Sequence, residues 1–292
     1  MSKPWILVCP SSRGIGHALT RHLLQHTRAP VLATARASSA EQQSSLRDAL
    51  LRGLPPSARD RLHLARVDVT DEATVRSAAE QAAALFPPGP RGHHLRLALA
   101  VPGILRPERA PAQVDAEAAL MTYRVNALGP LLLMKHFADF LPRRTTELLP
   151  PPEPEPREEE EEGEGGKKKK DLVVLPPRAV WVNMSARVGS VSDDRQGGWY
   201  SYRSSKAAVM SLSRSFDHQL RARSGDRAMA LSYHPGTVKT DLSKGFWESS
   251  AEKYRLLEPE EAAEYMLDVV TRKVGLEGRG KCFDWKGEEI QP

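Results

Sequence analysis

Two side chains able to do acid–base chemistry, Tyr202 and Lys206, stand four positions apart where apolar residues recur at helical spacing. Residues four apart lie on the same face of a helix, one turn from each other. A free tyrosine has a pKa near 10 and is a poor acid–base group at neutral pH, but a neighbouring ammonium favours the phenolate. The spacing therefore predicts a tyrosine tuned for proton transfer. A plain contact on a helix surface is the alternative, because this spacing is common by chance.

A glycine-containing turn near the start of the chain could hold a phosphate. It comprises Ser12, Arg13, Gly14, Ile15 and Gly16, and it separates an apolar strand from an amphipathic helix. The first N–H groups of a helix carry no intrahelical partner and attract anions, and glycine lets a backbone approach a pyrophosphate. A strand before the turn and a helix after it predict a dinucleotide site. An ordinary tight turn is the alternative.

The residue that would meet the adenosine ribose of such a dinucleotide is Arg36, just past the second apolar strand. An acidic residue at this point would bind the ribose 2′-hydroxyl, whereas an arginine can bind a 2′-phosphate through charge-assisted hydrogen bonds. Together with Arg13, it favours NADP(H) over NAD(H). A solvated surface arginine is the alternative.

The elements that must position these residues alternate between strand and helix signals. Strands are expected over 5–9, 30–34, 62–67, 95–101, 178–184, 228–233 and 280–285, and helices over 14–25, 44–51, 74–86, 115–140, 202–221 and 258–270. The helix over 115–140 is expected to break near 126–130. This alternation predicts right-handed βαβ units in one doubly wound α/β domain over 1–292, with three α/β/α layers and a mainly parallel seven-stranded sheet.

One tract interrupts this rhythm. Residues 145–175 combine a proline–glutamate repeat, a run of five glutamates at 158–162, a glycine-rich stretch and four lysines at 167–170. Such a composition cannot bury a core, so a disordered insertion is expected. Because it precedes a strand, it should lie at the amino ends of the strands, away from ligands bound at the carboxyl ends. A tolerated surface insertion and a docking segment for a protein partner both stay open.

Composition excludes several other classes of protein. The 292 residues carry a net charge of +5, and 40% of them are hydrophobic, which is enough for one sizeable core. No basic stretch interleaved with aromatics indicates nucleic-acid binding. Cys9 and Cys282 lie at opposite ends of the chain without CxxC spacing, which fits a reducing compartment, and no metal site is expected. With neither a cleavable signal nor a run of about 18 apolar residues, we expect a cytoplasmic protein that does not enter membranes.

Several of these segments resemble short-chain dehydrogenases/reductases, which have a Rossmann fold. Arg13-Gly14-Ile15-Gly16 matches the end of their glycine motif, and Tyr202-Arg-Ser-Ser-Lys206 matches their Tyr-x-x-x-Lys. Asn183-Met-Ser-Ala-Arg-Val-Gly189 and the Pro-Gly-x-Val-x-Thr pattern at 235–240 are similar to two further family segments. Gly197-Gly-Trp-Tyr-Ser-Tyr-Arg203 and the ending at 287–289 look most like the C-factor-like branch.

The resemblance implies a role for each matching residue. Tyr202 would donate a proton to a carbonyl oxygen, and Lys206 would also hold the nicotinamide ribose. Asn126 would hold a water in the proton relay behind the lysine; a plain helix-kink asparagine is the alternative. The remaining positions implied for the cofactor are Asp68, Val69 and Gly103 beside the adenine and Val238 and Thr240 at the carboxamide.

The chain also departs from the family pattern at informative positions. Pro10 replaces the first glycine of the motif, Ala186 stands where the catalytic serine belongs, and Ala100 and Val101 replace two asparagines. Ser185 or Ser190 could substitute for the serine, or the substrate could be positioned without that hydroxyl.

Two functions follow as hypotheses. The first is an NADP(H)-dependent oxidoreductase that reduces an aldehyde or ketone, or oxidises the corresponding alcohol. The second is a cofactor-binding scaffold or signalling protein with weak or no catalysis. Trp199, Phe246 and Trp247 suggest a pocket for an apolar carbonyl compound, although aromatic residues are equally common in cores. A homodimer or homotetramer is compatible with either hypothesis.

Overall fold

The computed structural model describes residues 1–89, 91–149, 175–248 and 255–292. Ten strands lie in this part of the chain: β1 (Lys3–Cys9), β2 (Val31–Ala35), β3 (Leu62–Arg66), β4 (His93–Ala100), β5 (Ala179–Met184), β6 (Ala228–His234), β7 (Thr237–Val238), β8 (Leu256–Leu257), β9 (Cys282–Asp284) and β10 (Glu289–Ile290). The α-helices are α1 (Gly14–His26), α2 (Ala40–Leu51), α3 (Ser57–Arg61), α4 (Glu72–Leu85), α5 (Ala116–Tyr123), α6 (Gly129–Phe137), α7 (Tyr200–Ser224) and α9 (Pro259–Asp268).

The central sheet has the strand order β3-β2-β1-β4-β5-β6-β9-β10. Its strands pair in parallel, except that β10 is antiparallel to β9. The predicted doubly wound α/β fold is therefore confirmed, but the predicted count of seven strands is wrong because β10 adds an eighth. β10 has two residues, which is too short to leave an alternating pattern in the sequence. The chain reverses its winding between β1 and β4, and this is the point where ligands bind in such sheets.

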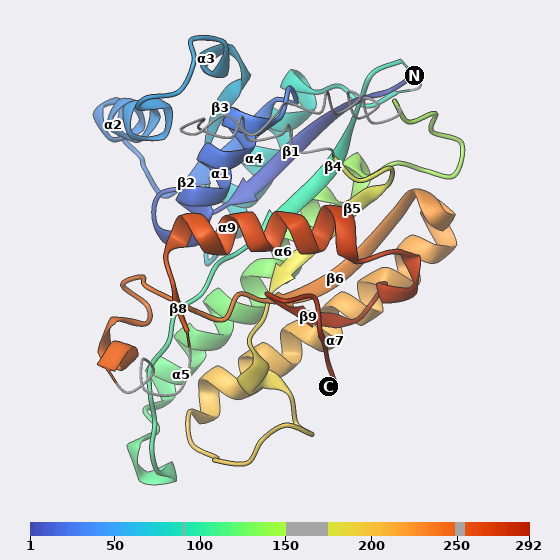
Figure 1. The fold of residues 1–292 in the computed structure, drawn as a ribbon. Coiled ribbons are helices and arrows are strands. Elements are labelled where there is room, and N and C mark those ends of the chain that lie inside the picture. The colour runs from blue at the N-terminus through green and yellow to red at the C-terminus, as the bar shows by residue number, and fades with distance from the viewer. Residues whose placement is uncertain (90, 150–174, 249–254) are drawn as a thin grey trace, which may run out of the picture.

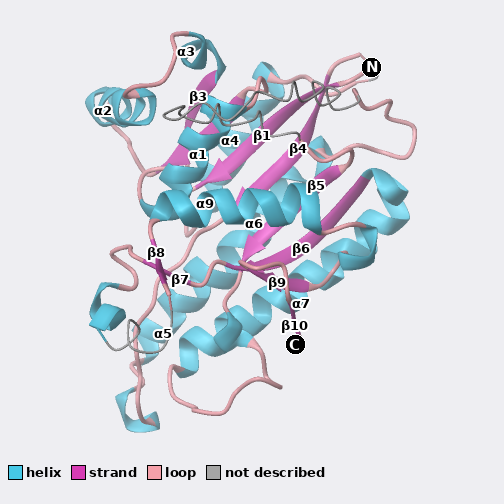
Figure 2. Cartoon of the chain, in the orientation of Figure 1, coloured by secondary structure: helices cyan, strands magenta, loops and turns pink. Residues whose placement is uncertain are grey.

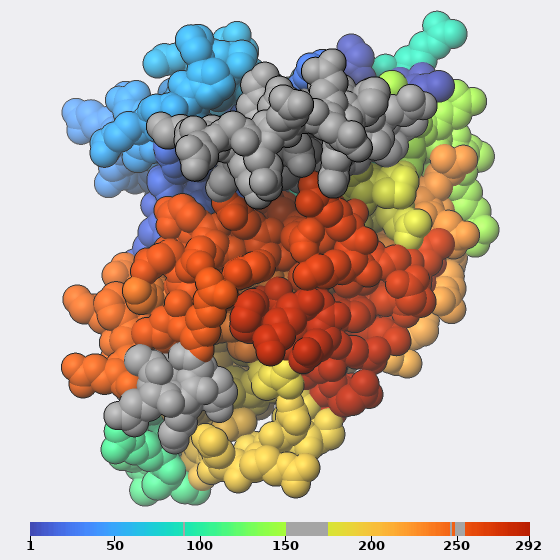
Figure 3. All heavy atoms as spheres, in the orientation of Figure 1, coloured from blue at the N-terminus to red at the C-terminus, as the bar shows by residue number. Residues whose placement is uncertain are grey.

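Helices cover both faces of the sheet, as Figures 1 and 2 show. Ile6 and Val8 of β1 face a core shared with α1 and α9, while Trp5 and Leu7 face a second core shared with α4, α6 and α7. Successive residues of a strand point to opposite faces, so the continuous apolar run of β1 serves both cores. Figure 3 shows the C-terminal segments, in orange and red, covering one of these faces.

The helix expected over 115–140 breaks where the sequence predicted. α5 ends at Tyr123, a π-helical turn occupies Arg124–Leu128, and α6 begins at Gly129. A π-helical turn inside an α-helix is rare and is often found at functional sites. Asn126 lies in this turn and is fully buried.

The two ends of the insertion meet at one buried side chain, Arg96 of β4. Its guanidinium donates to the carbonyl oxygen of Leu149 at 2.9 Å and to that of Pro176 at 2.7 Å, while its Nε donates to His94 at 2.9 Å. Ser2 also donates its N–H to the carbonyl oxygen of Glu147. The ends therefore lie at the amino ends of β1 and β4, as expected. The predicted insertion is too long at both margins, since residues 145–149 and 175 belong to the described structure; the disorder predicted for 150–174 falls outside it.

Candidate active site

The structure brings together three of the predicted catalytic residues and Gly103 at the carboxyl ends of β4 and β5. Lys206 Nζ lies 5.7 Å from the ring centroid of Tyr202 and donates to the carbonyl oxygen of Met184 at 2.9 Å. A Cβ atom on Gly103 would lie 3.7 Å from Lys206 Nζ and 3.9 Å from Asn126 Oδ1. Tyr202 and Lys206 are both buried. The tyrosine and lysine thus face the strand ends rather than solvent.

Asn126 fastens the segment that follows β4. Its Oδ1 accepts from the N–H of Ile104 at 2.8 Å, and its Nδ2 donates to the carbonyl oxygen of Ile104 at 3.0 Å and to Ser205 Oγ at 3.1 Å. The side chain therefore joins the π-helical turn, the loop after β4 and the helix that carries Tyr202. Asn126 thus lies at the break in the helix and also binds the backbone of Ile104.

Burial shifts the pKa values of Tyr202 and Lys206 in the directions that favour the neutral form of each side chain. It raises the pKa of Tyr202 to about 12 and lowers the pKa of Lys206 to about 8. The sequence led us to expect that a nearby ammonium would favour the phenolate, but loss of water around the phenol outweighs that attraction. Tyr202 is consequently protonated at neutral pH, which is the form needed to donate a proton to a carbonyl oxygen.

Ser185 and Ser190, the two serines considered as substitutes for the family's catalytic serine, both donate their hydroxyls to backbone carbonyl oxygens. Ser185 is buried and its Oγ donates to the carbonyl oxygen of Lys206 at 3.0 Å, while Ser190 Oγ donates to the carbonyl oxygen of Gln291. Ser185 is therefore bonded to the backbone of α7, and its neighbour Ala186 has no hydroxyl. A Cβ on Gly189 would lie 2.7 Å from the Lys206 carbonyl carbon, so this turn packs tightly on α7.

The turn after β1 combines features that are expected of the predicted phosphate site. Arg13 is the N-cap of α1, in an extended conformation and without a side-chain hydrogen bond to the first turn. The side chain of this N-cap residue therefore leaves the first N–H groups uncapped, and such groups attract anions. Gly14 has a φ of 54°, and a Cβ on Gly16 would lie 1.8 Å from the carbonyl oxygen of Pro10. Both glycines are thus required by the backbone, and Ser12 and Arg13 are exposed beside them.

Hydrogen bonds from Ser11 hold this turn although Pro10 replaces a glycine. The N–H of Ser11 donates to the carbonyl oxygen of Thr34 at 2.7 Å, and its Oγ donates to that of Val8 at 3.0 Å. Thr20 Oγ1 donates in turn to Ser11 Oγ at 2.9 Å. Sequence reasoning missed Ser11 and Thr20. The sequence signal that could have identified them is a serine directly after the strand and a threonine about two turns into the following helix.

The adenosine end of the predicted cofactor site carries positive charge. Arg36 is exposed directly after β2. Burial raises the pKa of Asp68, but hydrogen bonds from Thr70 and the charges of Arg36 and Arg66 hold it below its usual value. Val69 packs on the start of α6, since a Cβ atom added to Gly129 would lie 2.8 Å from the Cβ atom of Val69.

The segment after β6 packs on the turn that is predicted to hold the phosphate. Ile15 packs in one cluster with Val238, and a Cβ on Gly14 would lie 3.1 Å from Thr240 Cγ2. Trp247 Nε1 donates to Ser243 Oγ at 2.9 Å, and the ring of Trp199 meets that of Tyr202 edge-on at 6.1 Å. Of the three predicted aromatic residues, Trp199 therefore packs against Tyr202, the predicted catalytic tyrosine. The side chain of Phe246 is outside the described structure.

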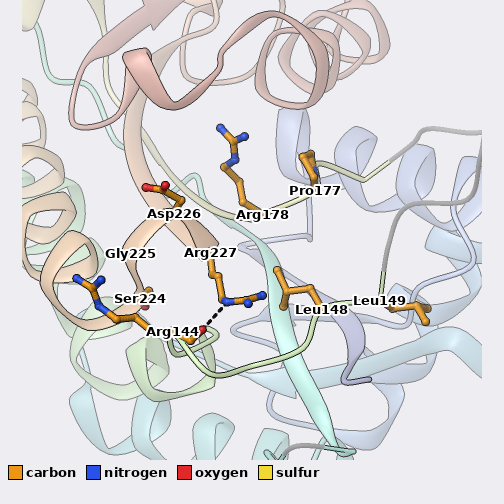
Figure 4. Close-up of a pocket in the computed structure, with 9 residues that line it drawn as sticks. All are labelled: Arg144, Leu148, Leu149, Pro177, Arg178, Ser224, Gly225, Asp226 and Arg227. Carbon is orange, nitrogen blue, oxygen red and sulfur yellow. Dashed lines mark hydrogen bonds between the residues drawn. The ribbon is translucent and has the colours of Figure 1, made fainter.

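A surface pocket of about 620 Å³ lies elsewhere, at the amino ends of β5 and β6. Arg144, Arg178, Asp226 and Arg227 line it, and Arg227 Nε donates to the carbonyl oxygen of Arg144. Figure 4 shows that their charged ends do not converge on one point. This pocket does not contain any of the residues predicted for catalysis or cofactor binding.

The described residues contain no group of His, Cys, Asp and Glu side chains suited to a metal ion. Among them, every helix is too short or too polar to cross a membrane.

Comparison with curated proteins gives two partial matches, and no family model matches the chain. One match is 1-hydroxy-2-glutathionyl-2-methyl-3-butene dehydrogenase of Rhodococcus sp., 42% identical over 80 residues, which are 27% of this chain and 32% of that protein. The other is an uncharacterised oxidoreductase of Schizosaccharomyces pombe, 26% identical over 177 residues, which are 58% of this chain and 56% of that protein. The matched part thus spans about a third to just over half of these relatives.

Solved structures match over the whole chain. NADPH-bound carbonyl reductase from chicken fatty liver superimposes with a TM-score of 0.75 at 23% identity, and carbonyl reductase Sniffer of D. melanogaster with 0.74 at 20%, each covering 100% of both chains. A short-chain dehydrogenase from Burkholderia cenocepacia in complex with NADP has a TM-score of 0.69 at 18% identity, over 98% of this chain and 97% of that one. The C-factor-like branch stays a prediction. The chain has the Rossmann-like α/β fold of short-chain dehydrogenases/reductases.

Proposed function

We propose that this protein is an NADP(H)-dependent oxidoreductase of the short-chain dehydrogenase/reductase family that reduces an aldehyde or ketone, or oxidises the corresponding alcohol. The observation that carries the proposal is the convergence of Tyr202, Lys206 and Asn126 beside Gly103 at the carboxyl ends of β4 and β5. This place is next to the point between β1 and β4 where the winding of the sheet reverses. Oxidoreductase names among the partial relatives and carbonyl reductases among the similar structures support the same reaction class.

The residues present fit a bound NADP(H). The start of α1 has no side-chain cap, Gly16 packs against the backbone of Pro10, and Arg36 adds positive charge beside Asp68. Ser12 to Gly16 would hold the pyrophosphate and Arg36 the 2′-phosphate, with Asp68, Val69 and Gly103 along the adenosine and Val238 and Thr240 near the carboxamide. When bound, the cofactor supplies or accepts the hydride.

The protein's own residues would handle the proton. Tyr202, protonated at neutral pH, would donate its phenolic proton to the carbonyl oxygen as that oxygen gains negative charge. The ammonium of Lys206 would stabilise the resulting phenolate, and Asn126 would hold the neighbouring backbone in place. In alcohol oxidation the same proton would move in the opposite direction.

Turnover of a panel of aldehydes and ketones with NADPH, for wild type and Tyr202→Phe, tests this function. We expect wild-type turnover, with Tyr202→Phe binding NADPH normally and losing at least about 10²-fold in kcat. Equal turnover by both proteins would refute the role of Tyr202.

A cofactor-binding scaffold with weak or no catalysis is the second candidate. The observation in its favour is that Ala186 presents no hydroxyl and both nearby serines bond to backbone carbonyls. Tight NADPH binding without turnover by wild type across the whole panel would favour it. A homo-oligomer, a cytoplasmic location and a protein partner for the charged insertion stay predictions.

A further inference from the structure

The first turn of α7, which carries Tyr202, lacks a cap of its own. The residue at the N-cap is Trp199, which has no oxygen in its side chain to accept from the first N–H groups. Its backbone is left-handed, with a φ of 50°, and follows Gly197 and Gly198 at 63° and 68°. A left-handed conformation is costly for a bulky residue and persists only where its surroundings impose it.

A buried carboxylate from another part of the chain supplies the missing cap. Glu108, in the loop after β4, is only 5% exposed. One of its carboxylate oxygens accepts from the N–H of Ser201 at 3.0 Å, and the other accepts from Ser201 Oγ. Its main-chain carbonyl oxygen also accepts from the N–H of Trp199 at 2.6 Å.

These three bonds hold Trp199 and Ser201, which lie just before the proposed catalytic tyrosine. Ser201 precedes Tyr202 directly, and the ring of Trp199 packs edge-on against the ring of Tyr202. A carboxylate at a helix N-terminus also interacts favourably with the helix dipole, and its charge-assisted bonds are shorter and stronger than neutral ones. Burying a charged carboxylate is costly unless it is fully hydrogen-bonded, so Glu108 is held where these bonds can form.

The same loop is fixed at its other end. Asn126 bonds both the N–H and the carbonyl of Ile104, and Glu108 bonds α7 four residues later. The loop between them therefore spans from the lysine side of the site to the tyrosine side, with both ends held by buried polar side chains.

We propose that Glu108 is a positioning residue for Tyr202: through Ser201 and Trp199 it fixes the rotation of the first turn of α7 and so the direction of the phenolic O–H. This inference rests on the proposed function. Displacement of a reacting group by about 1 Å can cost about 10²-fold in rate, so a modest loosening of this turn is expected to lower kcat.

Three substitutions test the proposal in the full-length protein. Glu108→Gln keeps the shape but replaces charge-assisted bonds with weaker neutral ones, and we expect kcat to fall about tenfold with little change in KM for NADPH. Ser201→Ala removes only the hydroxyl bond, and a smaller loss of about threefold is expected. Glu117→Gln, at an exposed glutamate in the first turn of α5, is the matched control and should keep wild-type kcat.

The deuterium isotope effect on kcat separates positioning from mere support of the fold. With NADPH deuterated at the transferred hydrogen, we expect a larger effect in Glu108→Gln, because the chemical step becomes more rate-limiting. Turnover is expressed per NADPH-binding site, so that unfolded protein does not count.

The proposal is overturned if Glu108→Gln and Ser201→Ala keep the wild-type kcat and isotope effect, even if their melting temperatures fall. If Tyr202→Phe retains wild-type turnover, the proposed function itself is wrong and the inference falls with it. If Tyr202→Phe is inactive while both capping variants turn over normally, only the inference is wrong.

Discussion

Gly16 offers a direct test of the phosphate turn, since the structure leaves no room for a side chain there. A Cβ added to Gly16 would lie 1.8 Å from the carbonyl oxygen of Pro10, 3.0 Å from its carbonyl carbon and 3.3 Å from Val101 Cγ2. Carbon and oxygen atoms in contact stay more than about 3 Å apart, so Gly16→Ala must push α1 away from the turn by over about 1 Å. Two of the three contacts are to backbone, which cannot move as a flexible side chain can.

This displacement has an effect on stability and an effect on binding. Overpacking of this kind costs about 1–3 kcal/mol of folding free energy. Moving the start of α1 also moves the N–H groups proposed to hold the pyrophosphate, so we expect the Kd for NADPH to rise at least about 30-fold, which is about 2 kcal/mol.

Titration of protein fluorescence with NADPH, together with thermal unfolding, measures both effects. Gly245→Ala is the matched control, because a Cβ on Gly245 meets nothing within 4 Å. Unchanged NADPH affinity in folded Gly16→Ala would refute the assignment of this turn to the phosphate.

Four further predictions follow from the site and the sheet. Arg36→Asp should weaken NADPH binding about 10–100-fold, because the 2′-phosphate loses a charge-assisted partner, while NADH binding stays the same or improves. Equal losses of affinity for both cofactors in parallel titrations would contradict this prediction. Ala186→Ser should raise kcat at least about tenfold by adding a hydrogen-bond donor near the carbonyl oxygen, and steady-state kinetics showing no gain would count against the site's orientation. Because burial lowers the pKa of Lys206 to about 8, its positive charge is present below that pH and lost above it, so kcat/KM for carbonyl reduction should decline above about pH 8. In Lys206→Arg the decline should move to higher pH. Identical pH profiles for the two proteins would disprove that the charge of Lys206 causes the decline. Arg96→Met should lower the free energy of unfolding by about 2–4 kcal/mol in denaturant titrations, because it leaves the buried carbonyl oxygen of Pro176 and the partly buried one of Leu149 without this donor. The exposed Arg59→Met is a control that should stay within about 0.5 kcal/mol.

Local spacing made much of the fold predictable from the sequence. The alternating apolar runs identified the seven longer strands of the central sheet, and the asparagine near a glycine and a proline identified the break between α5 and α6. Tyr202 and Lys206 were found because their relation is local, one helical turn.

Contacts between distant residues were not predictable in the same way. Glu108 and Ser201 are 93 positions apart, and Arg96 reaches Pro176 across 80 positions. Nothing in the neighbourhood of either residue indicates its partner. The direction of Ser185 and the raised pKa of Tyr202 likewise depend on burial against α7 and on the surrounding fold, which a motif does not specify.

Because Arg96 holds both Leu149 and Pro176, the stretch between Leu149 and the buried Leu175 could be exchanged for another sequence. A foreign sequence inserted there would begin and end near the same guanidinium, so its length would place little demand on the sheet. The splice point is at the amino ends of the strands, while Tyr202 lies at their carboxyl ends. A fluorescent reporter or an affinity tag could thus be carried inside the chain while the region around Tyr202 keeps its shape.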